Sequence, residues 1–124
     1  MISDHCHIDV VKYLHKEVGL EKQDFQSIYY NACIGACENG HIEVVKYLHK
    51  EVGLRKQDFQ SFDNYACEYA CENGHIEVVK YLHKEVGLEK QDFQVKNYCA
   101  YKKSIRNNHN VVTNYLLKEI KIIS

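Results

Sequence analysis

A stretch of twenty residues occurs three times in this chain almost without change, and this repetition constrains the fold more than any other feature. The copies are His7–Gln26, His41–Gln60 and His75–Gln94, and a fourth, divergent copy begins at His109. The first histidines of the four copies are 34 residues apart each time. Tandem copies of this length are typical of solenoids, in which each repeat buries its apolar face against its neighbours. The sequence therefore predicts a stack of similar units, numbered here copies one to four.

The composition fits a folded domain and excludes several classes of protein. Apolar residues make up 45% and charged residues 27% of the 124 residues, which is typical of a globular chain. The 16 basic residues oppose 17 acidic ones, so the chain lacks the positive charge of a nucleic-acid binder. Its apolar runs are too short to cross a membrane, and its first residues do not form a signal peptide. The six cysteines are then expected to be reduced thiols in the cytoplasm.

Each copy contains two helical patterns separated by a short turn. In copy two, Ala and Cys recur four residues apart near the start, and Gly40 is expected to end this short first helix in the left-handed conformation. The apolar residues of segment 41–51 follow helical spacing and predict a second helix, which Gly53 ends. Residues 54–65 have no clear period and are expected to form a loop, with Leu54 and Phe59 as its apolar anchors.

Residues 70–82, with the sequence ACENGHIEVVKYL, closely resemble the A-A-x-x-G-H-x-x-V-V-x-x-L stretch of the ankyrin repeat family, and the match recurs at residues 36–48. The resemblance implies an all-α helical solenoid of about three and a half repeats and roughly seven helices. The implied units are a partial repeat over 1–26, repeats over 27–60 and 61–94, and a divergent repeat over 95–124. It also implies a non-catalytic module that binds a partner protein on the concave face formed by the first helices and loop tips.

The loop departs from the family pattern. It lacks the family's G-A-D segment and is one residue longer, and the T-P-L-H opening of the first helix is absent. Either the β-hairpin of standard ankyrin repeats or an irregular or short helical segment is therefore expected here. The loop sequence VGLEKQDF also resembles ankyrin arrays of amoeba-infecting giant viruses and of microbes that live inside cells, which implies action in a host cytoplasm.

Cysteines recur with the repeat and raise the question of a zinc site. The pairs Cys33/Cys37 and Cys67/Cys71 each lie one helical turn apart. Neighbouring helices pack with their axes roughly 8–10 Å apart, whereas zinc needs its four sulfurs within about 4 Å of one another. We therefore interpret these cysteines as small apolar core residues. A weak metal site at His5, Cys6 and His7 is the remaining alternative, and no metal or cofactor is predicted.

Histidines and tyrosines also recur with the period, and structural roles are expected for both. His7, His41, His75 and His109 follow the turn between the two helices. His15, His49 and His83 lie near the ends of the second helices and are expected to face carbonyl groups or solvent. Tyr13, Tyr47, Tyr81 and Tyr115 are expected to be half-buried with the hydroxyl in water. No motif of a nucleophile, phosphate loop or metalloprotease occurs, so no enzyme activity is predicted.

The copies differ mainly in the loop tip and first helix, where aromatic and charged residues replace one another. Such residues are common anchors of protein interfaces. Divergence there predicts a surface that binds a partner protein. The alternative explanation of the divergence is drift after duplication or repair of packing at a repeat junction. The predicted contact residues are Tyr30, Asn31, Ile34, Phe62, Asp63, Asn64, Glu68, Tyr69, Tyr98 and Lys102.

The two ends of the array support a second hypothesis. Copy one has only its second helix, and Ile120, Ile122 and Ile123 in copy four form an apolar edge that expects a neighbour. The chain is then a structural spacer or part of a longer array, with self-association through its incomplete terminal repeats. Neither nucleic acid nor a membrane is expected among its partners.

Overall fold

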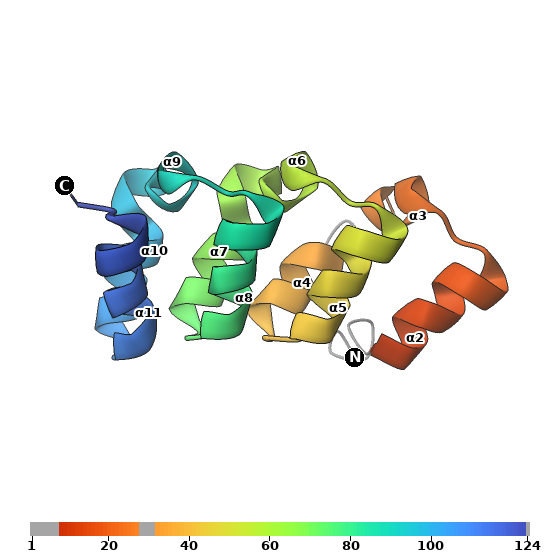
Figure 1. Ribbon diagram of the computed structural model, residues 1–124, viewed down its shortest axis with the longest axis horizontal. Helices are drawn as coiled ribbons and strands as arrows, with labels where there is room; N and C mark the ends of the chain where they lie inside the picture. Colours follow the sequence, from red (N-terminus) through yellow and green to blue (C-terminus); the bar gives the residue numbers. More distant parts are fainter. Residues whose placement is uncertain (1–7, 28–31, 124) are drawn as a thin grey trace.

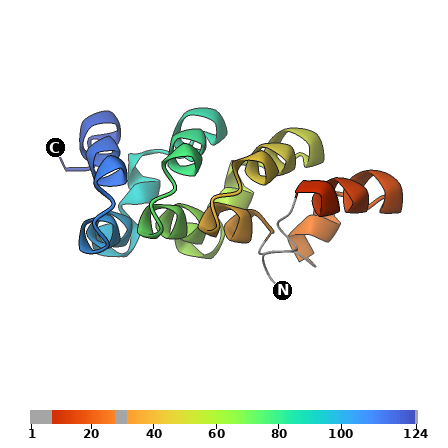
Figure 2. The same cartoon turned by 90° about the horizontal axis from the view of Figure 1, so that it is seen from below.

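The computed structural model describes residues 8–27 and 32–123, and these residues form helices and no strands. The helices stack side by side in two layers, with first helices on one side and second helices on the other (Figures 1 and 2). The first helices are α4 (Ala32–Glu38), α7 (Ser61–Glu72) and α10 (Val95–Arg106). The second helices are α2 (Ile8–Lys12), α5 (Ile42–Tyr47), α8 (Ile76–Tyr81) and α11 (Asn110–Tyr115). The predicted all-α solenoid is confirmed.

Each second helix continues into a final π-helical turn that widens the helix. These turns are η1 (Tyr13–Val18), η2 (Leu48–Val52), η3 (Leu82–Val86) and η4 (Leu116–Ile120). As predicted, Gly53 ends the second helix of copy two, and it has the left-handed conformation, with φ of +95°. Its N–H donates to the carbonyl of Leu48, which closes the helix end.

Three further short helices occupy the connections between copies, so the number of helices is larger than predicted. They are α3 (Lys22–Ser27), α6 (Lys56–Phe59) and α9 (Lys90–Phe93). In α6 the Asp58 carboxylate accepts a hydrogen bond of 2.7 Å from the backbone N–H of Arg55, which fixes the start of the helix. Phe59 and Leu54 are buried, as expected of its apolar anchors. The short helical form of the loop therefore replaces the β-hairpin.

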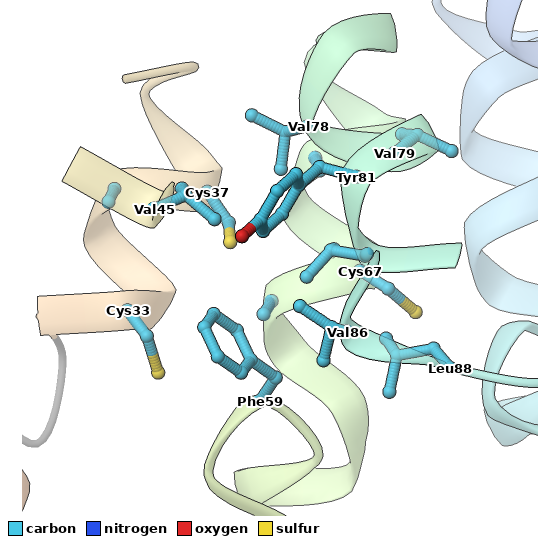
Figure 3. Packing of buried hydrophobic residues seen from close by; sticks show 14 of the residues in the cluster. Cys33, Cys37, Val45, Phe59, Cys67, Val78, Val79, Tyr81, Val86 and Leu88 are labelled. Atoms are coloured by element: carbon cyan, nitrogen blue, oxygen red, sulfur yellow. The ribbon is translucent and has the colours of Figure 1, made fainter. Parts of the chain in front are cut away.

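The core runs through every junction between copies, and Figure 3 shows side chains of α4 and α5 meeting those of α7 and α8. Cys33, Cys37, Cys67 and Cys71 are at most 4% exposed, as the interpretation of small core residues requires. The thiols of Cys33 and Cys67 also donate to the carbonyls of Asp58 and Asp92 in the following loop. Burial raises the pKa of the Cys33 thiol to about 12, which keeps it protonated as a donor.

A histidine and a tyrosine from successive copies form a hydrogen bond at each junction. The Nδ1 to hydroxyl distances are 2.7 Å for His15–Tyr47, 2.7 Å for His49–Tyr81 and 2.8 Å for His83–Tyr115. Each imidazole also meets a buried phenylalanine of its own copy edge-on, as His49 meets Phe59 at 5.9 Å between ring centroids. The predictions that these histidines face carbonyls or solvent and that these tyrosine hydroxyls stay in water are therefore wrong. The bond joins residues 32 positions apart, beyond the reach of helical spacing.

The first histidine of copy three and that of copy four each pack against a glycine of the copy before. Gly40 and Gly74 end the first helices with φ of +73° and +76°. A Cβ atom on Gly40 would lie 2.5 Å from Nδ1 of His75, and one on Gly74 would lie 2.5 Å from Nδ1 of His109. Glycine is required here by its positive φ and by the neighbouring ring.

The apolar edge predicted at the end of copy four is mostly covered by the chain itself. Ile120 and Ile122 are buried, and only Ile123 of the three is exposed. The N–H of Ile122 donates to the carbonyl of Leu116, the bond that Leu88 makes to Leu82 one copy earlier. The expectation that Ile120 and Ile122 await a neighbour is wrong, because they repeat the inward positions of Val86 and Leu88.

Replacing Gly74 by Ala is expected to destabilise the stack more than replacing Gly87 by Ala. Both residues have positive φ, so each substitution adds about 1 kcal/mol of backbone strain. Only the Cβ at position 74 meets the His109 ring, whereas nothing lies within 4 Å of a Cβ at position 87. Overpacking costs about 1–3 kcal/mol more. Urea unfolding of both variants measures the difference, and equal losses would contradict the packing role of His109.

The stack is expected to lose stability as the pH falls from neutral towards 5. Burial lowers the pKa of His49 and His83 below the ordinary value of 6.5, and the adjacent lysines add to this. As the pH falls through 6.5, the two histidines bind protons in the unfolded chain before they do so in the folded chain, and the free energy of unfolding therefore decreases. The decrease ends once the pH is below the lowered pKa of these histidines in the folded chain. The double variant His49→Asn/His83→Asn should show a flatter slope in urea titrations across this range. An unchanged slope would exclude these two groups as its source.

Candidate functional site

Three aromatic side chains of α7 form a continuous stack on the first-helix layer, which we call the first-helix aromatic patch. The Phe62 and Tyr65 rings are stacked at 6.3 Å between centroids, and the Tyr65 and Tyr69 rings follow at 5.2 Å. The ammonium group of Lys96, from α10, lies 4.1 Å from the centroid of the Tyr65 ring. Phe62 is 53% exposed, while both tyrosines are half-buried. The patch therefore presents one open aromatic ring on a supported base.

An uncommon backbone turn holds Phe62 in this position. Phe62, Asp63 and Asn64 have φ of 57°, 57° and 62°, the left-handed region that residues with side chains rarely adopt. The same turn recurs at Lys96, Asn97 and Tyr98 in copy four. Each left-handed residue costs of the order of 1 kcal/mol, so surrounding contacts must hold the turn.

Polar contacts to Asp92, in α9 at the end of the same copy, supply that support. The Asn64 amide donates to the carboxylate of Asp92 at 3.2 Å, and the Gln60 amide donates to the same oxygen at 2.8 Å. The N–H of Asn64 also donates to the carbonyl of Gln60, which closes the turn at 3.0 Å. Asn64 and Asp92 are both buried, so these hydrogen bonds are shielded from water.

A buried carboxylate lies beneath the patch, between α7 and α10. Glu68 is 4% exposed and accepts from Lys103 at 2.7 Å and from Lys96 at 3.1 Å. Burial pushes the pKa of Glu68 upward, but the hydrogen bonds from Lys103, Lys96 and Cys99 outweigh it and lower the pKa overall. The hydrogen bond to Glu68 raises the pKa of Lys103, which also reaches Glu72 at 3.2 Å.

The structure separates the predicted contact residues into two groups. Ile34, Asn64 and Glu68 are 4%, 7% and 4% exposed, and they lie in the junctions between copies. Their divergence is therefore explained by junction packing, the alternative reading, and we leave them out of the contact surface. Tyr30 and Asn31 lie outside the described residues.

The other predicted contact residues reach the surface. Phe62, Asp63 and Lys102 are exposed, and Tyr69 and Tyr98 are half-buried. Sequence reasoning missed Tyr65 and Lys96, which complete the patch. The spacing of Tyr65 and Tyr69 by four residues marks one helix face and could have revealed Tyr65, whereas Phe62 lies in the left-handed turn before that face. No sequence signal places Lys96 over the ring, because it comes from the next copy.

Shallow grooves separate neighbouring second helices on the opposite layer. The largest has a volume of about 400 Å³ and lies between α2 and α5, and two smaller ones follow along the stack. Lysine and glutamate side chains from corresponding positions line all three, so the grooves repeat with the copies. In the described part of the chain, no three histidine, cysteine or acidic side chains gather as metal ligands. Nor does any helix there have the length and apolarity needed to span a membrane.

Replacing Lys103 by Met is expected to lower the free energy of unfolding by about 2 kcal/mol, because it removes the closest charged partner of a buried carboxylate. Lys96→Met should cost less, since its contact with Glu68 is longer. The lowered pKa of Glu68 contributes stability above the ordinary value of 4.5 and loses it as the pH falls. Lys103→Met should therefore lose less stability on acidification than the wild type. Calorimetry across this range measures both effects, and equal costs for the two lysines would contradict the assignment.

Comparison with known proteins agrees with the repeated architecture. A family model described as ankyrin repeats (3 copies) matches residues 1–94 and 33–124. No curated protein and no solved structure matches the chain. The likeness to the arrays of giant viruses stays a prediction.

Proposed function

Because the chain belongs to the ankyrin repeat family, we propose that it is a protein-binding module whose first-helix aromatic patch contacts a partner protein. Ankyrin repeats are in general protein–protein interaction modules. The contact residues of this proposal are Phe62, Asp63, Tyr65, Tyr69, Lys96 and Tyr98.

The exposure of Phe62 is the observation that carries the proposal. The exposed half of this ring buries no apolar surface in the folded chain alone, and the turn that holds it is strained. Tyr65 and Tyr69 prevent the ring from moving freely, so little conformational entropy remains to be lost on binding. Fixed aromatic residues beside a cation are common hot spots of protein interfaces.

The surroundings of the thiols support a module without catalysis. Burial raises the pKa of Cys33 and Cys71 and also that of Cys67, so these groups stay protonated and are poor nucleophiles. Members of the ankyrin repeat family are typically non-catalytic. Buried free thiols also fit a reducing compartment, so we propose a cytoplasmic location.

Phe62→Ala is expected to abolish partner capture and to leave the fold intact, because the ring is more than half exposed. The wild type and the variant are used as baits in cell lysate, and the retained proteins are compared by quantitative mass spectrometry. Tyr13→Ala is the matched control, since Tyr13 is 60% exposed and lies on η1 in the other layer. Circular dichroism confirms equal helicity of the three baits.

A protein retained by the wild type and Tyr13→Ala but lost from Phe62→Ala would support the proposal. If no protein distinguishes the two variants, the patch is not a binding site. That result would favour the spacer hypothesis. Ile120 and Ile122, the apolar edge that first suggested this hypothesis, are nevertheless buried within the chain itself.

A further inference from the structure

The last copy lacks the residues with which each earlier copy contacts the copy that follows it. At the last two junctions a histidine ring packs against a glycine, and at all three a histidine nitrogen forms a hydrogen bond with a tyrosine hydroxyl. At the junction of α7 and α10, two glutamates of α7 also receive a lysine. The positions 34 residues after Gly74, His83, Glu68 and Glu72 belong to copy four, whose helices α10 and α11 end the stack (Figure 1). They hold Asn108, Leu117, Lys102 and Arg106.

Asn108 removes the space for a further histidine ring. Asn108 has φ of +61°, the same left-handed conformation as Gly74. A Cβ at position 74 would lie 2.5 Å from the next histidine, so the side chain of Asn108 fills the place where such a ring would pack. Leu117 in turn has no nitrogen to offer a tyrosine hydroxyl.

The charges at this end are reversed as well. Glu68 and Glu72 attract Lys103 of the next copy, but Lys102 and Arg106 would repel a lysine in that position. Both are exposed, and neither has an ion pair within the described residues. The helix α10 contains four basic residues and no acidic one. Another repeat of this kind is therefore a poor fit for this end.

Two apolar side chains are exposed near these cations in the same copy. Ile105, three residues after Lys102 and next to Arg106 in the chain, is 48% exposed, and Leu117 on η4 is 38% exposed. In copy three the residues at these positions are Cys71, fully buried, and His83, half-buried, because copy four covers them. We call Lys102, Ile105, Arg106 and Leu117 the C-terminal end face.

We propose that the C-terminal end face binds an acidic amphipathic segment of a partner protein. Its carboxylates pair with Lys102 and Arg106, and its apolar side chains cover Ile105 and Leu117. Exposed apolar groups flanked by unpaired charges of one sign fit a partner of the opposite sign with apolar anchors. Lys102 and Arg106 correspond in the repeat to Glu68 and Glu72, which face the next first helix, so this surface lies on the side of α10 away from α7 and is separate from the first-helix aromatic patch.

A random peptide display library provides the test. Selection on the wild-type chain, with depletion on Lys102→Glu/Arg106→Glu, should enrich peptides rich in Asp and Glu with apolar residues at helical spacing. The charge-reversed variant should keep its fold, because copy three carries glutamates at the corresponding positions 68 and 72. The leading peptide is then synthesised, and its affinity is measured by fluorescence anisotropy at low and high salt.

The charge-reversed variant is expected to bind this peptide about tenfold more weakly or worse, and salt should weaken wild-type binding. Lys50→Glu/Lys84→Glu makes the same change in net charge on exposed positions of the second helices and should bind as the wild type does. Phe62→Ala should also bind normally, which separates this result from a failure of the aromatic patch. No enrichment, an enriched pool without acidic bias, or equal weakening by the control pair would overturn the proposal. Concentration-dependent dimers lost in the charge-reversed variant would overturn it too, in favour of a second copy as the occupant.

Discussion

The hydrogen bond from a histidine of one copy to a tyrosine of the next fixes how the copies stack. In the bond between His49 and Tyr81, the imidazole is also held by Phe59, so it has little freedom to turn. A partly buried hydrogen bond of this kind contributes only about 1 kcal/mol in net terms, but an unmade one costs more. The bond therefore acts mainly on register, because a copy displaced along its neighbour would leave a partly buried ring nitrogen and a buried tyrosine hydroxyl without partners. The glycine that receives His75 sets the same register at the other end of the second helix.

The second helices are nearly identical, so they alone do not determine which copy packs next to which. The divergent first helices determine this order. The junction between α4 and α7 buries Ile34, an apolar residue, whereas the next junction buries Glu68 against two lysines. Exchanging the neighbours would leave Glu68 buried without a cation, which is costly for a charged group. The divergence at Ile34 and Glu68, which resembles a binding surface in the sequence, therefore specifies which copy follows which.

Features that depend on local sequence could be predicted, and features that depend on the next copy could not. The helices, the left-handed Gly53 and the buried Leu54 and Phe59 follow from spacing and from residue type within one copy. For the loop between copies, the sequence left open either a β-hairpin or an irregular or short helical segment, and the structure has the short helix. The burial of Glu68 and the position of Lys96 over Tyr65 require knowledge of how two first helices meet. The left-handed turn at Phe62 contains no glycine, so residue type does not predict it.

Stacking leaves few places where a chain of this kind can hold a binding surface. Each inner copy is covered on both sides, so a residue that varies without serving a junction must lie on the layer surfaces or at an end. Phe62 meets this condition, yet the turn that exposes it is held by Asp92 of the same copy, which accepts hydrogen bonds from Asn64 and from Gln60 of the copy before. The hydrogen bond between Gln60 of copy two and Asp92 of copy three, which crosses a junction, thus helps to offset the strain of the turn. A partner that covers Phe62 would favour the same turn, so binding and the stability of that junction are expected to rise together.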